Sequence, residues 1–368
     1  MRMNLGKIGA QESTSLVAIV LSVTGIFTVE SAVAYANGNS TFLTVPASII
    51  VGFLVFLLCL FAMNKLGVAT FHELADRAVG EKLSCVFMLI LSASLLFNAF
   101  VLLLRFATII HSYIFVESDY IRVALWIFLP VLSLSLFGFE TLGRMAKIFG
   151  VALLVLFLLG FVSATDGFSV HRLYPLFGDG AYNIAISSFK NSYKFIPAFI
   201  APLVLSKGIN GVKTVKKSVI IGSVFAVLLS FITQLVIGLT YEYTSLSNMY
   251  FPLCRLNMSL QNEDYFMRTD RIGVFIWLVA GVIAIAYYVY AAGFIFCKKT
   301  GTRDIRPCIV CFMIILSSLV LAEYTKLYAV LHGVISIIES NSFIVMLLIV
   351  LTVTLLGLLK RGKERQKE

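Results

Sequence analysis

The stretch LSVTGIFTVESAVA, from Leu21 to Ala34, lies within the first apolar run of the chain. It raises the question of whether a run that contains a glycine and a glutamate forms a membrane-spanning helix. Gly25 would cost the interior of a helix about 1 kcal/mol relative to alanine. Glu30 would cost roughly 2.5–3.5 kcal/mol at membrane depth. If this run crosses a bilayer, both residues are unfavourable there, and we therefore expect them to have a use.

The composition is that of a membrane protein. Of the 368 residues, 60% are hydrophobic and 13% are charged, whereas soluble domains carry about 25% charged residues. In lipid every backbone polar group must be satisfied internally, so the long apolar runs are expected to be helices. We predict an all-α integral membrane protein with about ten transmembrane helices of about 20 residues or more. The expected spans are 12–34, 43–64, 83–114, 121–138, 143–164, 181–206, 217–240, 270–297, 306–325 and 338–359.

The basic residues favour alternate connections between these runs. Most of the 29 Lys and Arg lie in every second connection, among them Arg2 and Lys7 before the first run and several residues after the last. Under the positive-inside rule, these connections and both termini are cytoplasmic. The formal net charge of +10 therefore reports topology and does not indicate a nucleic-acid partner. A signal-peptidase site at residues 32–36 is an alternative, which the preceding carboxylate of Glu30 disfavours.

Ten spans divide into two sets of five. Because five is odd, the first set begins at the cytoplasm and the second begins outside, so the second set is inverted relative to the first, as in many secondary transporters. We predict one transmembrane domain with repeats at about 8–165 and 175–360 and a basic tail at 360–368. Segment one contains Thr24-Gly25, and segment six contains Asn191, Ser192, Pro197 and Pro202. Proline removes a helix hydrogen bond, so we expect segments one and six to be broken around a ligand site. Alternatively, Gly25 only permits close helix packing.

Two groups of candidate site residues follow from this arrangement. The expected ligand-binding residues are Thr24, Gly25, Ile26, Phe97, Val101, Pro197, Ala198, Ala286, Tyr287 and Tyr290, although the aromatic and aliphatic ones equally suit plain packing. Charges at membrane depth are functional candidates by default, and those expected to act in gating or as a charge pair are Glu30, Arg105, Lys190 and Lys194. We expect Glu30 and Lys194 to pair across the outer mouth of the site, with simple solvation of these charges as the alternative.

Catalytic and metal-binding patterns are weak. The four histidines fall in separate connections or helix ends, so they form no ligand set with metal-site spacing. The pair Cys308-x-x-Cys311 is better explained as two small apolar residues on a span. We therefore expect no enzyme activity, no cofactor and no metal. The segment Thr70 to Gly80 is expected to be an amphipathic cytoplasmic helix that lies on the membrane or docks a partner.

Several stretches resemble one family in order and spacing along nearly the whole chain. RTDRIGVFIWLVAGVIAIAYYVYAA, from Arg268 to Ala292, is similar to the eighth-helix signature of the B-subunit of spore germinant receptors, the GerAB-type membrane proteins. FGFETLGRMAKIFG, with Gly138, Glu140 and Arg144, resembles the family's loop between helices four and five. The end of the family's third helix is similar to LLLRFATIIHSYIFVESD. Its loop before helix eight resembles YFPLCRL, and its loop before helix six resembles RLYPLF.

The resemblance implies a ten-helix member of the amino acid–polyamine–organocation superfamily with a LeuT-like fold. It implies location in the spore inner membrane and partnership with A-type and C-type (lipoprotein) receptor subunits, which we expect Glu140 and Arg144 to contact. It also implies that a small nutrient, typically an amino acid, is sensed at a mid-membrane site. The alternatives are an autonomous amino-acid/ion symporter, or a receptor subunit that gates a water or ion path without binding the germinant.

Overall fold

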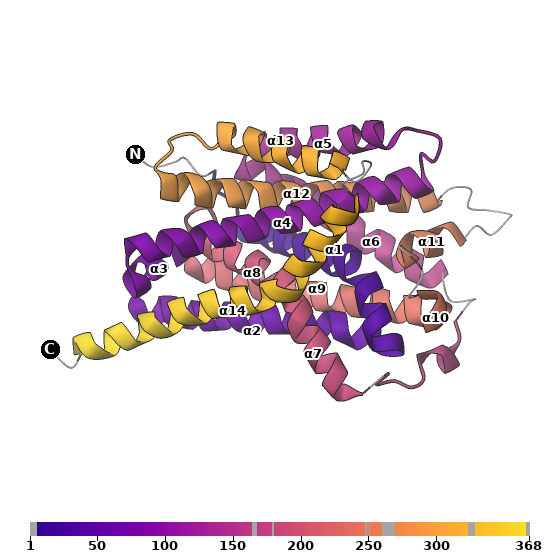
Figure 1. Cartoon of the computed structure of the whole chain (residues 1–368), viewed down its shortest axis with the longest axis horizontal. Coiled ribbons are helices and arrows are strands. Elements are labelled where there is room, and N and C mark those ends of the chain that lie inside the picture. The colour runs from indigo at the N-terminus through magenta and orange to yellow at the C-terminus, as the bar shows by residue number, and fades with distance from the viewer. Residues whose placement is uncertain are drawn as a thin grey trace.

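The computed structural model of the chain describes residues 6–163, 168–178, 180–246, 249, 251–259, 269–322 and 328–365, which are helical apart from short connections. The helices are α1 (Ala10–Asn37), α2 (Thr41–Leu66), α3 (Phe71–Val79), α4 (Glu81–Tyr113), α5 (Tyr120–Phe137), α6 (Phe139–Ser163), α7 (Ala181–Asn191), α8 (Phe195–Val204), α9 (Val212–Thr240), α10 (Tyr243–Leu246), α11 (Pro252–Ser259), α12 (Thr269–Thr300), α13 (Arg306–Ala322) and α14 (Tyr328–Arg365). Most of the long helices run along one axis, and the described chain begins and ends at the same end of the bundle (Figure 1).

Each of the ten predicted runs coincides with a helix or a helix pair. Within the described residues, seven helices are long and apolar enough to cross a membrane, in α1, α2, α4, α5, α9, α12 and α14. The other three predicted runs coincide with α6, with the α7–α8 pair and with α13, an apolar helix of 17 residues. The predicted all-α membrane architecture is therefore confirmed.

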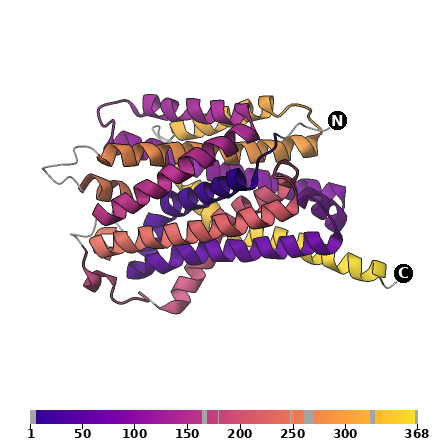
Figure 2. The ribbon, with the colours of Figure 1, turned by 180° about the vertical axis from the view of Figure 1, so that it is seen from behind.

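The core is built around α1 and α12. The first half of α1 is buried and packs against α2, α6, α9 and α12. The two longest predicted segments, α4 and α12, lie against each other (Figure 1). Gly281 permits this approach, because a Cβ at that position would lie 2.4 Å from the ring of Phe106. Behind them, α2 and α9 run side by side (Figure 2).

The predicted break in segment six is confirmed. Helix α7 ends at Asn191, a 3-10 turn η4 covers Ser192–Lys194, and α8 begins at Phe195. Pro197 lies in the first turn of α8, where the backbone N–H groups have no intrahelical acceptor and a missing donor costs little. The break therefore falls at membrane depth, in the position that the sequence indicated.

The predicted break in segment one is wrong, because α1 is one continuous helix. The hydroxyls of Thr24 and Thr28 donate to the carbonyls of Val20 and Thr24, one turn earlier, so they supplement the helix without interrupting it. A Cβ at Gly25 would lie 3.0 Å from Ser230 Oγ on α9. The alternative interpretation of Gly25, close packing of helices, explains this position.

The short helix α3 does not present its apolar face to a membrane surface. Phe71, His72 and Leu74 are buried, and the helix packs against α2, α4, α8 and α14. Thr70 caps it by accepting from the backbone N–H of Glu73, whose carboxylate accepts from the backbone N–H of Ala69. Of the two predicted arrangements, the membrane-surface one is therefore replaced by packing onto the bundle.

Candidate functional site

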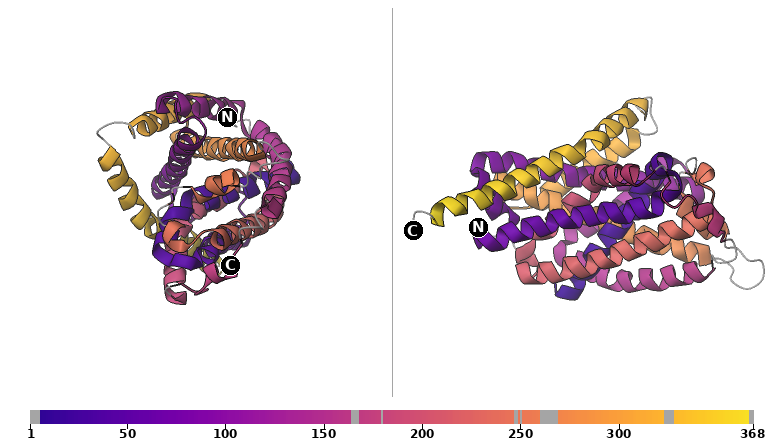
Figure 3. Two further views of the ribbon diagram at one scale, coloured as in Figure 1. Left: turned by 90° about the vertical axis from the view of Figure 1, so that its right-hand side faces the viewer. Right: turned by 90° about the horizontal axis from the view of Figure 1, so that it is seen from below.

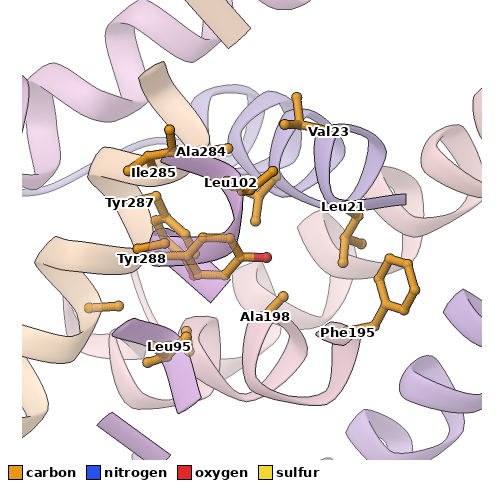
Figure 4. Packing of buried hydrophobic residues seen from close by; sticks show 14 of the residues in the cluster. Leu21, Val23, Leu95, Leu102, Phe195, Ala198, Ala284, Ile285, Tyr287 and Tyr288 are labelled. Carbon is orange, nitrogen blue, oxygen red and sulfur yellow. The ribbon is translucent and has the colours of Figure 1, made fainter. Parts of the chain in front are cut away.

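A buried hydroxyl pair joins α1 to α12 at the middle of the bundle. Thr24 Oγ1 and the Tyr288 hydroxyl lie 2.7 Å apart, and both residues are fully buried. Because the Thr24 hydroxyl proton is directed to the Val20 carbonyl, Tyr288 is the donor to Thr24. Figure 4 shows the Tyr288 ring reaching from α12 into the space between α1 and α8, near Leu102 and Ala198.

Three further buried hydroxyls, those of Ser22 on α1, Ser230 on α9 and Tyr287 on α12, have no hydrogen-bond partner among the described residues. Ser22 is two residues before Thr24 and so points to nearly the opposite side of α1, whereas Ser230 faces Gly25 across the α1–α9 contact. Leaving a buried hydroxyl unpaired costs about 1–3 kcal/mol. A polar group that supplied a partner to any of these hydroxyls would recover part of that free energy, which makes them candidate ligand-binding groups.

The predicted ligand-binding residues separate into two groups. The first group is buried on α1, α4, α8 and α12 and consists of Thr24, Ile26, Val101, Pro197, Ala198, Ala286 and Tyr287. Gly25 lies beside Thr24 in the chain. Phe97 instead lines an apolar cavity between α4, α13 and α14. Tyr290 stacks on Phe139, with ring centroids 5.8 Å apart, and lines a different pocket. The geometry thus leaves Phe97 and Tyr290 at the edge of the proposed site or beyond it.

The charged residues are also dispersed. The ammonium of Lys194 donates to the Thr28 carbonyl at 2.7 Å and lies 3.4 Å from the carboxylate of Glu339 on α14. The side chain of Lys194 is 4% exposed and that of Glu339 is 30% exposed. Lys190 is exposed on α7. The guanidinium of Arg105 lies over the Phe251 ring, 5.9 Å from its centroid.

The pair predicted between Glu30 and Lys194 stays a prediction. Glu30 belongs to α1, but its side chain lies outside the part of the chain that the structure describes. Lys194 is held where segment six is broken, and Asn98 of α4 donates to its backbone carbonyl at 2.8 Å. Two charges taken out of water attract each other strongly, and removing one of them leaves the other uncompensated.

Sequence reasoning missed Glu339, Tyr288 and Ser230 as site residues. Glu339 lies within the tenth expected span, so the same argument that selected Lys194, a charge at membrane depth, would have found it. Tyr288 is part of the eighth-helix signature, but nothing in the sequence distinguished it from Tyr287. Ser230 becomes informative only through the contact of α9 with α1.

Glu140 and Arg144, the predicted partner contacts, form an ion pair one helical turn apart on α6, with side chains 45% and 68% exposed. Glu140 also lines a pocket of about 280 Å³ at the junction of α5 and α6, together with Arg303 of the α12–α13 connection and Arg306, the first residue of α13. This surface is polar and accessible. An exposed ion pair contributes about 0–1 kcal/mol, so the pair contributes little to the stability of α6.

Comparison with known proteins agrees with this architecture. A family model described as "Spore germination protein" matches residues 7–326. The structure is similar to a substrate-bound, outward-open Na⁺-coupled sialic acid symporter, with a TM-score of 0.67 and 14% identity over 94% of this chain and 79% of that chain. It is also similar to Mhp1, a nucleobase-cation-symport-1 family transporter with bromovinylhydantoin bound. The TM-score is 0.66, with 11% identity over 97% of this chain and 92% of that chain.

A third similar structure is MhsT in complex with L-phenylalanine, with a TM-score of 0.65 and 12% identity over 92% of this chain and 87% of that chain. No curated protein sequence matches the chain. The structural similarities show that the chain has the LeuT-like fold of membrane transporters, as the sequence predicted.

Proposed function

We propose, from the premise that this chain belongs to the spore germination protein family, that it is the nutrient-sensing subunit of a spore germinant receptor. The nutrient is a small polar molecule, and an amino acid fits best. The subunit acts in the spore inner membrane with both termini cytoplasmic, together with A-type and C-type partner subunits. Glu140 and Arg144 form part of the surface for those partners.

The observation that carries this proposal is the buried polar set at the middle of α1. Thr24 and Tyr288 are hydrogen-bonded there, and Ser22, Ser230 and Tyr287 have hydroxyls without partners among the described residues. An amino acid offers a carboxylate acceptor and an ammonium donor, which together can pair with such hydroxyls. The fold supports the same reading, since one similar structure is a complex with L-phenylalanine and another holds bromovinylhydantoin.

The charge pair suggests how binding is signalled. Lys194 bonds to the Thr28 carbonyl, one turn along α1 from Thr24, so its ammonium lies near the edge of the polar set. A ligand carboxylate would compete with Glu339 for this ammonium. Losing that contact would release α14 from the broken segment, and a ligand shifts an equilibrium only through such a differential contact.

A germination assay tests the proposal. Spores that lack this chain are exposed to a panel of amino acids and other small nutrients, and the release of spore contents is followed over time. We expect the loss of response to a defined nutrient and its return when the gene is restored. A full response to every nutrient, in a strain without a second copy, would refute the receptor function.

The fold also favours a second function, amino-acid symport, because two of the similar structures are cation-coupled symporters. Uptake of the same radiolabelled nutrient into proteoliposomes of the purified subunit separates the two functions. A sensor binds the nutrient without accumulating it, whereas a symporter accumulates it when a Na⁺ or proton gradient is imposed.

A further inference from the structure

A large apolar cavity lies outside the proposed nutrient site. Residues of α4, α13 and α14, with Tyr193 of η4, enclose about 570 Å³. Helix α14 crosses the bundle obliquely (Figure 3), and the cavity lies between it, α4 and α13. Its walls are mostly large aliphatic and aromatic side chains, including Phe97, Phe312 and Leu316.

The position of the cavity places it in the hydrocarbon region of the membrane. The part of α4 that lines it extends from Ile90 to Phe100, near the middle of a 33-residue helix. The cavity opens sideways, since Ile315, Ile337 and Val345 are 54%, 64% and 44% exposed. A molecule that enters it from the side would therefore come from the bilayer and not from the water.

Water and a partner helix both fit this cavity poorly. Apolar cavities stay dry, because a buried water needs two to four polar partners. Close contact with another transmembrane helix favours small residues that let backbones approach, whereas most of these walls are large aliphatic and aromatic side chains and only Ala93, Ser94 and Ser342 are small. An empty cavity would forfeit the dispersion contacts of all its lining atoms. A flexible hydrocarbon chain satisfies each of these conditions.

We propose that the cavity between α4, α13 and α14 is a binding site for one acyl chain of a membrane phospholipid. The site goes beyond the proposed sensing function and does not depend on it. Its inner end is at Tyr193, the neighbour of Lys194, and Asn341 and Ser342 of α14 follow Glu339 closely in the chain. The acyl chain therefore contacts α14 within one turn of Glu339.

Fluorescence quenching by brominated lipids tests this site. In a Trp126→Phe, Trp277→Phe background, Phe97→Trp places a single reporter in the cavity wall. The purified subunit is reconstituted into phosphatidylcholine vesicles with bromine atoms near the middle of the acyl chains. We expect the emission to lose most of its intensity relative to unbrominated vesicles. Phe106→Trp, at a buried site on the same helix, should be quenched much less.

Filling the cavity distinguishes its occupant from lipid at the outer surface. Ala93→Phe, added to the Phe97→Trp protein, should restore most of the emission, because it takes the space of the acyl chain. Phe312→Trp on the opposite wall gives an independent reporter if the first variant does not fold. Quenching that is weak at both reporters, or that Ala93→Phe leaves unchanged, would overturn the proposal. Weak quenching at both would also favour a partner's helix as the occupant in the assembled receptor.

Discussion

The ammonium of Lys194, at the break of segment six, lies 3.4 Å from the carboxylate of Glu339 on α14 and donates to the Thr28 carbonyl on α1. One side chain thereby connects three membrane helices that are far apart in the sequence. A lysine that is 4% exposed needs such partners, because an ammonium at membrane depth is strongly destabilised without them.

Breaking this pair should harm the protein more than deleting it. We expect Glu339→Gln to leave the Lys194 ammonium uncompensated and to lower the free energy of unfolding, by less than the roughly 3–5 kcal/mol typical of fully buried pairs. Lys194→Met should also destabilise, and the double variant should regain part of the loss. Thermal unfolding in detergent measures all three, and additive losses in the double variant would show that the two charges act independently.

The same cycle tests the pair predicted from the sequence. If Glu30 contacts Lys194, Glu30→Gln and Lys194→Met should also be non-additive, both in unfolding and in the nutrient concentration that gives half-maximal germination. If the effects of Glu30→Gln and Lys194→Met are additive, while those of Glu339→Gln and Lys194→Met are not, the ammonium of Lys194 pairs with Glu339 alone.

Adding one carbon at Gly25 should lower the stability of the protein. A Cβ at this position would lie 3.0 Å from Ser230 Oγ, and overpacking of this kind costs typically 1–3 kcal/mol. We expect Gly25→Ala to lower the unfolding temperature and Ser230→Gly to restore part of it. Gly333→Ala is the matched control, because nothing lies within 4 Å of its added carbon. Equal effects of Gly25→Ala and Gly333→Ala would contradict the close-packing role of Gly25.

His72 should make the protein less stable in mild acid. It is 1% exposed, packs its ring edge-on against Phe294, and has no hydrogen bond to either nitrogen among the described residues. Burial, with help from Lys298, Lys299 and Lys207, lowers its pKa well below the usual 6.5. Below that value the unfolded chain binds a proton that the folded chain does not, so stability falls as the pH falls.

The measurement for His72 is the unfolding temperature between about pH 7 and pH 5, the range in which an unperturbed histidine titrates. His72→Phe keeps the ring contact and removes the proton, so its unfolding temperature should fall less steeply than that of the wild type. Burial raises the pKa of Glu73, but its hydrogen bonds from Lys207 and from the Ala69 backbone, with the nearby lysine charges, outweigh this and lower the pKa below its usual 4.5. This neighbour therefore does not add to the slope in that range. A wild-type slope in His72→Phe would contradict the prediction.

The spans were readable from the sequence because membrane insertion depends on continuous apolar length, which is a local property. The break in segment six was readable for a similar reason, since Asn191, Ser192 and Pro197 are local helix breakers. Gly25 misled the same reasoning. A single glycine costs a helix about 1 kcal/mol, less than the several kcal/mol of leaving one backbone group unsatisfied in lipid, so α1 stays continuous.

The partners of the site residues were not readable in this way. Lys194 and Glu339 are brought together by the crossing of α14 over η4, and Thr24 and Tyr288 by the packing of α1 on α12. Such pairings depend on which helices pack against each other in the tertiary structure. No local sequence pattern in either segment predicts that packing. The sequence therefore indicated which helices form the site and which kinds of residues lie there, but not which hydroxyls and charges meet.

We propose above that a nutrient binds at the hydroxyls of Thr24 and Tyr288. Equilibrium binding of the nutrient identified by the germination panel, measured by calorimetry on the purified subunit, tests it most directly. Tyr288→Phe removes one hydroxyl and keeps the ring, so we expect the dissociation constant to rise by up to about tenfold, the loss of one hydrogen bond. Tyr182→Phe, at a tyrosine that is 76% exposed, should bind as the wild type does. Unchanged affinity in Tyr288→Phe, with the protein folded and binding intact, would place the nutrient elsewhere and contradict the claim.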